Sequence, residues 1–166
     1  MYKLGYEPIF LDETMVTTKQ NLEMTWAGRH QSIAVDRKQT QIDPIAVLAA
    51  VSASHGVELV RQYPKSVDKY KFEEFLQLLR AKIGDRRVVL VLDNLSVHSC
   101  AFTKHRMALH GFKWAYTPIY HPDSNPIESV FAIVKRQFRK LKLRNVLNDE
   151  KVRIDELIDR SFAIVS

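Results

Sequence analysis

The segment TPIYHPDSNPIE occupies residues 117–128 and leads from a loop into the predicted start of a helix. Asn125 would be the N-cap, Pro126 the first helical residue and Glu128 the third, which is a capping box with Asn in place of Ser or Thr. A structural role therefore accounts for this pattern. A carboxylate near a helix N-terminus is also favoured in its charged form by the helix dipole, so Glu128 is a candidate for a functional acid as well.

Two further acids follow apolar runs and are predicted to lie at the ends of strands. Asp12 ends the run IFL, and Asp93 ends the run VVLVL at residues 88–92. If these strands are parallel neighbours, both carboxylates emerge at the same end of the sheet, where ligands collect in open α/β sheets. An aspartate after a strand is also a common turn residue, so the structural interpretation stays open for each one taken alone.

The sequence after Glu128 has the spacing of an amphipathic helix. At about 100° per residue, Lys135, Arg139 and Lys142 fall on the same edge as Glu128. A row of cations leading away from a carboxylate suits a phosphate backbone, so we expect these three residues to bind DNA. A solvated basic face is the alternative interpretation. The predicted apolar stripe beside this edge consists of Ile127, Val130, Phe131, Val134, Phe138 and Leu141.

Together, the three acids favour a metal-dependent enzyme that cleaves phosphodiesters. Mg²⁺ prefers carboxylate, water and phosphate oxygens, and two ions roughly 3.5–4 Å apart can hold the attacking and leaving oxygens of an in-line displacement. Asp12, Asp93 and Glu128 are therefore the predicted catalytic and metal-binding residues, with two Mg²⁺ ions. Asn94 and His98 follow Asp93 closely and could support this site, although a turn position and a first helical turn explain them equally well.

The composition is that of one globular domain. The chain has 166 residues, 46% of them hydrophobic, which is sufficient for a core of its own. The net charge of +6 is compatible with a polyanionic partner but is weak evidence alone. Cys100 is the single cysteine, so an internal disulfide framework is excluded. No run approaches the ~18–20 apolar residues of a membrane span, and we expect a soluble, intracellular protein with no membrane partner.

The order of the predicted elements indicates an α/β fold. Successive strands joined by short turns imply an antiparallel meander, and the continuous apolar run before Asp93 is typical of a buried parallel strand. This order fits a mixed sheet with helices on its faces. The expected strands are 8–12, a hairpin with its turn at 19–21, 45–53, 57–63, 88–92 and 112–116, and the expected helices are 68–82, 97–109, 126–142 and 150–164.

Three segments resemble the catalytic domain of the mariner superfamily of DDE transposases, which includes related bacterial insertion-sequence transposases. The matching segments are FLDET at 10–14, VLDNLSVH at 91–98 and TPIYHPDSNPIESVFAIVKR at 117–136. Between Asp93 and Glu128 there are 34 residues, a spacing shared by that branch. The resemblance implies an RNase H-like fold over the single domain 1–166, with a five-stranded mixed sheet flanked by helices on both faces. It also implies that Asp12, Asp93 and Glu128 form the acidic triad.

The resemblance further implies phosphodiester hydrolysis and strand transfer in cut-and-paste DNA transposition, with water and then a 3′-hydroxyl as nucleophile. Mg²⁺ would be the cofactor, with Mn²⁺ as substitute. Double-stranded DNA, both transposon ends and target, would be the partner, and a homodimer is expected because relatives act as dimers. The protein would act in the nucleus of a eukaryote or in the cytoplasm and nucleoid of a bacterium.

Family members carry helix-turn-helix DNA-binding modules before the catalytic domain, whereas this chain begins almost at the first catalytic strand. We therefore expect that the N-terminal DNA-binding region is absent here. Two other functions stay open. One is a domesticated, catalytically idle DNA-binding domain that kept the fold, and the other is a metal-dependent nuclease without strand transfer.

Overall fold

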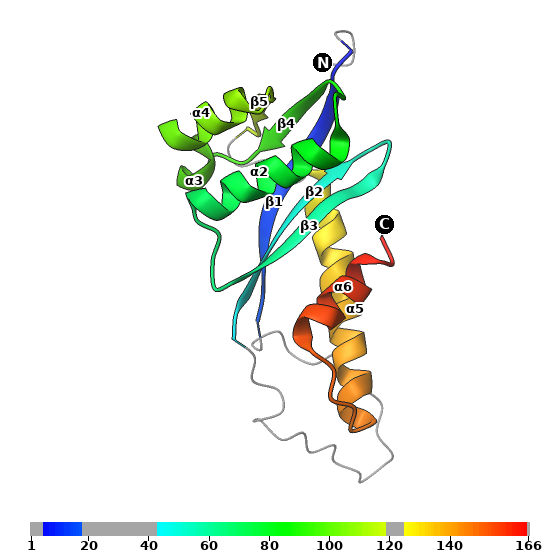
Figure 1. Ribbon diagram of the computed structural model, residues 1–166. Helices are drawn as coiled ribbons and strands as arrows, with labels where there is room; N and C mark the ends of the chain where they lie inside the picture. Colours follow the sequence, from blue (N-terminus) through cyan, green and yellow to red (C-terminus); the bar gives the residue numbers. More distant parts are fainter. Residues whose placement is uncertain (1–4, 18–42, 119–124, 166) are drawn as a thin grey trace.

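The structure is a computed structural model that describes residues 5–17, 43–118 and 125–165. Its elements are β1 (Glu7–Val16), β2 (Ile45–Ser52), β3 (Gly56–Pro64), α2 (Lys69–Ile83), β4 (Val88–Leu92), α3 (Ser96–Ser99), α4 (Ala101–Leu109), β5 (Lys113–Tyr116), α5 (Pro126–Leu147) and α6 (Ile154–Phe162). The strands form a five-stranded mixed sheet in the order β3-β2-β1-β4-β5 (Figure 1). The expected α/β class is therefore confirmed.

The sheet combines an antiparallel half with a parallel half. β1 pairs antiparallel with β2, and β2 pairs antiparallel with β3, as a meander requires. β1 pairs parallel with β4, and β4 pairs parallel with β5. Because the chain must cross over between parallel neighbours, α3 and α4 lie between β4 and β5 in sequence. The strand that carries Asp12 is thus the parallel neighbour of the strand that precedes Asp93.

Helices cover both faces of the sheet, and alternate residues of each strand point into two separate cores (Figure 1). α2 and α4 cover one face, where they enclose Ile9 and Leu11 of β1. α5 and α6 cover the other face, on the side of Phe10. Asp12 is in phase with Phe10 and therefore faces α5, whereas Glu13 faces α2.

The two longest helices follow the predicted periodicity. α2 begins after Asp68, whose carboxylate accepts hydrogen bonds from the next turn, and it ends at Gly84 with a φ of 59°. Within α5, four of the six predicted stripe residues are buried and the other two are partly buried in the same core. None of the helices in the described residues is both long and apolar enough to cross a membrane.

Several element boundaries differ from the prediction. The single helix expected over 97–109 is divided at Cys100, whose backbone is extended, and the Thr103 hydroxyl bonds the Val97 carbonyl at 2.6 Å. That carbonyl would otherwise accept a helical N–H bond. α5 is longer and α6 shorter than expected. The hairpin expected around 19–21 lies outside the described residues.

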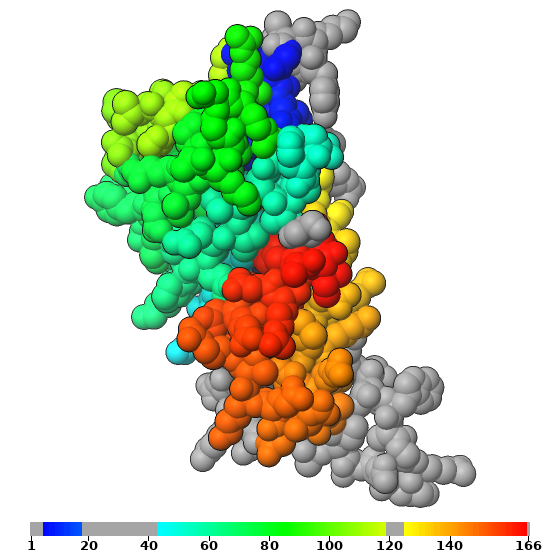
Figure 2. Space-filling view, turned by 45° about the vertical axis from the view of Figure 1, so that its right-hand side comes forward, coloured from blue at the N-terminus to red at the C-terminus, as the bar shows by residue number. Residues whose placement is uncertain are grey.

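α6 contacts both β3 and α5 on the same face of the sheet. Gln62 of β3 donates through Nε2 to the Asp155 carbonyl at 3.0 Å and to Asp159 Oδ1 at 2.7 Å. Leu157 and Ile158 are buried in the core shared with α5. Figure 2 shows α6 in red between the blue-green β2–β3 hairpin and the orange half of α5. The C-terminal helix therefore fixes the distal half of α5 to the antiparallel edge of the sheet.

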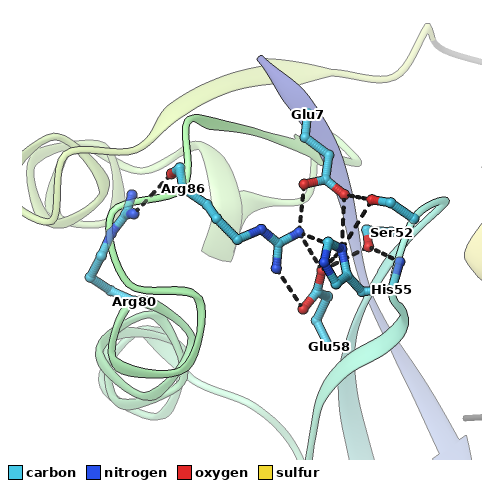
Figure 3. Close-up of polar contacts among 7 residues, drawn as sticks. Glu7, Ser52, His55, Glu58, Arg80 and Arg86 are labelled. Carbon is cyan, nitrogen blue, oxygen red and sulfur yellow. Dashed lines mark hydrogen bonds and ion pairs between the residues drawn. The ribbon is translucent and has the colours of Figure 1, made fainter. Parts of the chain in front are cut away.

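An ion-pair cluster fixes the first residue of β1 to the β2–β3 hairpin and to the segment before β4 (Figure 3). Arg86 donates to Glu7 Oε2 at 2.5 Å and to both oxygens of Glu58, at 2.8 and 3.1 Å. Glu58 is 4% exposed and also accepts from Ser52 at 2.7 Å. His55 lies beside the same guanidinium, with Nδ1 2.9 Å from Nη2. One arginine thus forms ion pairs with two carboxylates that belong to different strands.

Replacing Arg86 with Met should lower the free energy of unfolding by about 2–4 kcal/mol at pH 7, because the buried Glu58 carboxylate loses its counter-ion. Burial raises the pKa of Glu58, but hydrogen bonds from Arg86 and Ser52 outweigh it and hold that pKa below its ordinary value. This stabilisation is therefore present at neutral pH and disappears as the pH falls through the lowered pKa. Urea denaturation at several pH values measures both effects.

Arg61→Met is the matched control, because Arg61 pairs with Glu74 at an exposed position. Exposed pairs contribute only about 0–1 kcal/mol. Equal, small losses of stability for Arg86→Met and Arg61→Met would contradict the assigned role of the cluster.

Candidate active site

The parallel pairing of β1 and β4 brings Asp12 and Asp93 to neighbouring positions. Phe10 is in register with Val91, so each acid lies two residues further along its own strand direction. β4 ends directly before Asp93, whereas β1 continues because it pairs with β2 along its length. Asp12 therefore lies within a strand and not at its end, which corrects the prediction. Both acids are at the carboxyl end of β4, as expected from the apolar runs.

Asp93 is held by the turn that follows β4. Its Oδ1 lies 2.6 Å from Nδ1 of His98 and accepts from the Leu95 N–H at 3.4 Å. His98 is 2% exposed, its ring packs on Phe72 with the centroids 4.8 Å apart, and its carbonyl accepts from the Tyr116 hydroxyl. Burial raises the pKa of Asp93, but the hydrogen bond and charge of His98 outweigh it, so the pKa is lowered. A packed imidazole thus orients a charged carboxylate.

Asp12 lies in a more acidic environment. Its Oδ1 accepts from the Glu13 N–H at 2.7 Å, and its Oδ2 accepts from Asn125 Nδ2 at 3.2 Å. Burial is the largest cause that raises the pKa of Asp12 to about 6, and the negative charges of Asp93 and Glu128 raise it further. Both acids are therefore close enough to Asp12 to repel its charge. Three acids from distant parts of the sequence share one environment.

Glu128 reaches this environment from the first turn of α5. Ile127, next to it, is buried against the sheet, and Glu128 itself is exposed. Asn125 and Pro126 occupy the predicted N-cap and first helical positions, but the Asn125 side chain makes no capping hydrogen bond. It is instead bonded to Asp12. The predicted capping box is therefore wrong, because a tertiary partner takes the side chain that would cap the helix.

The three acids present the hard oxygen donors that Mg²⁺ and Mn²⁺ take. Burial and then repulsion raise the pKa of Asp12, and a bound cation would oppose both by favouring the charged carboxylate. Among the described residues, a second group, Glu7, His55 and Glu58, has candidate ligand atoms that all lie within 4.8 Å of one another. That second group already contains the Arg86 guanidinium. It lies about 17 Å from Asp12 along β1 and is not part of this site.

The predicted supporting and basic residues have different surroundings. Asn94 is exposed beside Asp93. Burial and the nearby Arg139 lower the pKa of Lys135, whereas the charge of Asp12 opposes this change. Arg139 is partly exposed, with its Nε buried and without a partner among the described groups. The charge of Asp12 thus acts on Lys135, and Arg139 follows one turn further along α5.

Lys142 is 8% exposed and does not lie on the open edge that helical spacing indicated. α6 packs on the same half of α5, and Lys142 and Leu157 line one small pocket between them. The helical projection considered α5 alone, without the neighbour that covers this position. Lys142 is thus buried by packing, and this prediction is wrong.

The comparisons with known proteins agree with this geometry. The family model described as "DDE superfamily endonuclease" matches residues 7–151. A chain of the simian T-cell lymphotropic virus intasome in complex with PP2A regulatory subunit B56 gamma is similar at a TM-score of 0.69 and 14% identity, covering 94% of this chain and 46% of that one. A search of the curated proteins finds no match.

Two further structures are similar at comparable levels. The Mos1 transposase paired-end complex with left transposon end has a TM-score of 0.61 and 15% identity, covering 99% of this chain and 54% of that one. The trimeric HTLV-2 integrase catalytic core domain in complex with magnesium has a TM-score of 0.60 and 13% identity, covering 94% and 82%. The chain spans about half the length of the intasome and Mos1 chains. The expected RNase H-like fold is confirmed.

Replacing Asp12 with Asn should stabilise the metal-free protein at pH 8 by about 1–3 kcal/mol, because ionisation of this buried carboxylate opposes folding. Its raised pKa of about 6 means that the gain is present above pH 6. The gain should shrink as the pH falls and disappear near the ordinary pKa of 3.8, where the acid is neutral in both states. Urea denaturation across this pH range gives the measurement.

Asp68→Asn is the control with the opposite sign. Hydrogen bonds from the backbone of Lys71 and Tyr70 lower the pKa of Asp68, so removing its charge should not stabilise the protein at pH 8. A destabilising effect of Asp12→Asn at pH 8 would show that the carboxylate is not repelled in the folded state.

Proposed function

Because the chain belongs to the DDE superfamily endonuclease family, we propose that it is the metal-dependent catalytic domain of a mariner-type transposase. In this proposal it hydrolyses phosphodiester bonds and transfers strands in cut-and-paste DNA transposition. One observation carries the proposal. Asp12 lies beside Asp93 across two parallel strands and is hydrogen-bonded to Asn125, the residue just before the helix that carries Glu128.

The proposed metal ligands are Asp12, Asp93 and Glu128, which would hold two Mg²⁺ ions or Mn²⁺ as a substitute. When bound, such ions stabilise the attacking and leaving oxygens of an in-line displacement. His98 keeps the Asp93 carboxylate oriented through Nδ1, and Asn94 lies at the exposed start of the same turn. The magnesium complex of the HTLV-2 integrase core and the Mos1 catalytic domain with Mn support this choice of ion.

Double-stranded DNA is the proposed partner, both as transposon end and as target. The Mos1 structures with a left transposon end and as a strand transfer complex support this choice. Lys135 and Arg139 follow Glu128 along α5, and the charge of Asp12 acts on Lys135, which supports a role for these cations near the acids. In this proposal the two residues would bind DNA phosphates along α5, leading away from the metal ligands.

The proposal extends to assembly and domain organisation. Residues 1–166 would form one catalytic domain that acts as a homodimer, for which the dimeric form of the HTLV-2 integrase core is a precedent. In the family, an N-terminal DNA-binding region recognises the transposon ends, so this domain would supply the chemistry and the local binding of phosphates. It would act in the nucleus of a eukaryote or on the nucleoid of a bacterium.

Asp93→Asn should abolish Mn²⁺ binding in calorimetry and also the nicking of supercoiled plasmid, because it removes one ligand and its bond to His98. Glu150→Gln is the matched control, since Glu150 lies just beyond the distal end of α5, and it should leave both measurements unchanged. Nicking that persists in Asp93→Asn would contradict the proposed site. Mn²⁺ binding without nicking by the wild type, with duplex DNA present, would favour the idle DNA-binding alternative.

Replacing Lys135 and Arg139 together with Ala should weaken duplex binding and reduce the slope of log K against log[salt] by about 1 for each phosphate that the variant no longer neutralises. Fluorescence anisotropy between low and physiological salt measures both quantities. Arg136 and Lys140 are exposed on the same helix further round, so their double Ala variant is the control for net charge. Equal slopes for the two double variants would show that only overall charge matters.

A further inference from the structure

Asn125 makes a contact that a helix cap does not require. It is 7% exposed and precedes the first residue of α5. Asparagine is favoured at an N-cap because its side-chain oxygen accepts from an N–H of the first turn. Here no such bond forms, and Nδ2 donates to Oδ2 of Asp12 at 3.2 Å, across 113 positions of sequence. The side chain is therefore used for the acidic site and not for the helix.

The orientation of the Asn125 amide follows from its charged partner. Nδ2 must face the carboxylate, because an amide oxygen at that position would repel it. Oδ1 is then buried and has no hydrogen-bond partner among the described groups. A buried carbonyl without a partner opposes folding. Natural proteins break local rules in this way mainly at functional sites, so this conflict indicates a functional requirement.

Asn125 also links the first acid to the third. Its carbonyl accepts from the Glu128 N–H at 3.1 Å, while its amide holds one oxygen of Asp12. The other oxygen of Asp12 accepts from the Glu13 N–H at 2.7 Å. The Asp12 carboxylate is thus held at both oxygens. One of these two hydrogen bonds comes from the residue that also fixes the first turn of the helix carrying Glu128.

We infer that Asn125 is a positioning residue of the metal site, which orients the Asp12 carboxylate and fixes its placement relative to Glu128. This inference rests on the proposed function, because it assigns the orientation of a proposed metal ligand. Partners that orient metal-binding carboxylates typically change the affinity for the ion by about 10–100-fold when they are removed. Asn125 acts through Asp12 and has no assigned contact with the reacting atoms.

Asn125→Ser separates positioning from capping. Serine is as good an N-cap as asparagine, but its hydroxyl is too short to replace the hydrogen bond to Asp12. The dissociation constant for Mn²⁺, measured by calorimetry with MnCl₂ alone, should rise about 10-fold or more. Asn148→Ser, at the exposed C-cap of the same helix, should leave it unchanged. Wild-type affinity in Asn125→Ser would overturn the inference.

A double-mutant cycle tests the hydrogen bond without any metal. Asn125→Ser should lower the urea midpoint of the wild type relative to its effect in an Asp12→Ala background, because the wild type loses the hydrogen bond and the background has already lost the partner. Equal shifts in the two backgrounds would show that Asn125 and Asp12 do not interact, and this would overturn the inference as well.

The two measurements also separate this inference from the proposed function. A wild type that does not bind Mn²⁺, alone or with duplex DNA, would contradict the proposed function. If the double-mutant cycle still showed an interaction between Asn125 and Asp12, their hydrogen bond would have a structural role only, and the positioning role would be overturned. Wild-type Mn²⁺ binding together with unchanged affinity in Asn125→Ser would overturn the inference and leave the proposed function intact.

Discussion

The parallel register between β1 and β4 is the constraint on which the acidic site depends. It is set by the alternation along β1, in which Ile9 and Leu11 enter one core and Phe10 enters the other. A shift of one residue would turn every side chain of β1 to the opposite face. Glu13 would then face α5, and Asp12 would be buried against α2. The hydrophobic pattern that stabilises the sheet therefore also selects which acid faces Glu128.

The acids at the start of β1 and further along it have opposite electrostatic surroundings. At the start of the strand, Glu7 and Glu58 both form ion pairs with the guanidinium of Arg86, so each carboxylate has a cationic partner within the protein. Further along, Asp12 has acids near it, and its pKa is raised. Proteins hold such unfavourable arrangements only where the surrounding structure is strong enough to maintain them. The ion-pair cluster and the helices on both faces supply that support.

The sequence predicts most elements of this fold because each depends on local information. Asp12 and Asp93 are identified from the apolar runs before them, and the continuous run before Asp93 correctly indicates a parallel strand. The position of both acids at one end of the sheet is therefore predictable without a structure. His98, five residues after Asp93, is a candidate from the sequence, and the structure shows its Nδ1 2.6 Å from the Asp93 carboxylate. The features that the sequence does not predict depend on distant partners. The Asn125 side chain bonds a carboxylate that is remote in sequence and does not cap its own helix. Lys142 is covered by α6. In each case a local rule indicates one arrangement and a tertiary contact imposes another.

The unequal lengths of β1 and β4 have a consequence for self-association. Within the described strands, the ladder between them covers only Glu7–Phe10, so the later part of β1 pairs only with β2. An unpaired strand edge is a template on which another chain can add a strand and begin an aggregate. Here that stretch carries Asp12 and Glu13, and a second copy would bring the same charges against them. Asp12, an acid proposed for catalysis, therefore also opposes aggregation along this edge, together with Glu13.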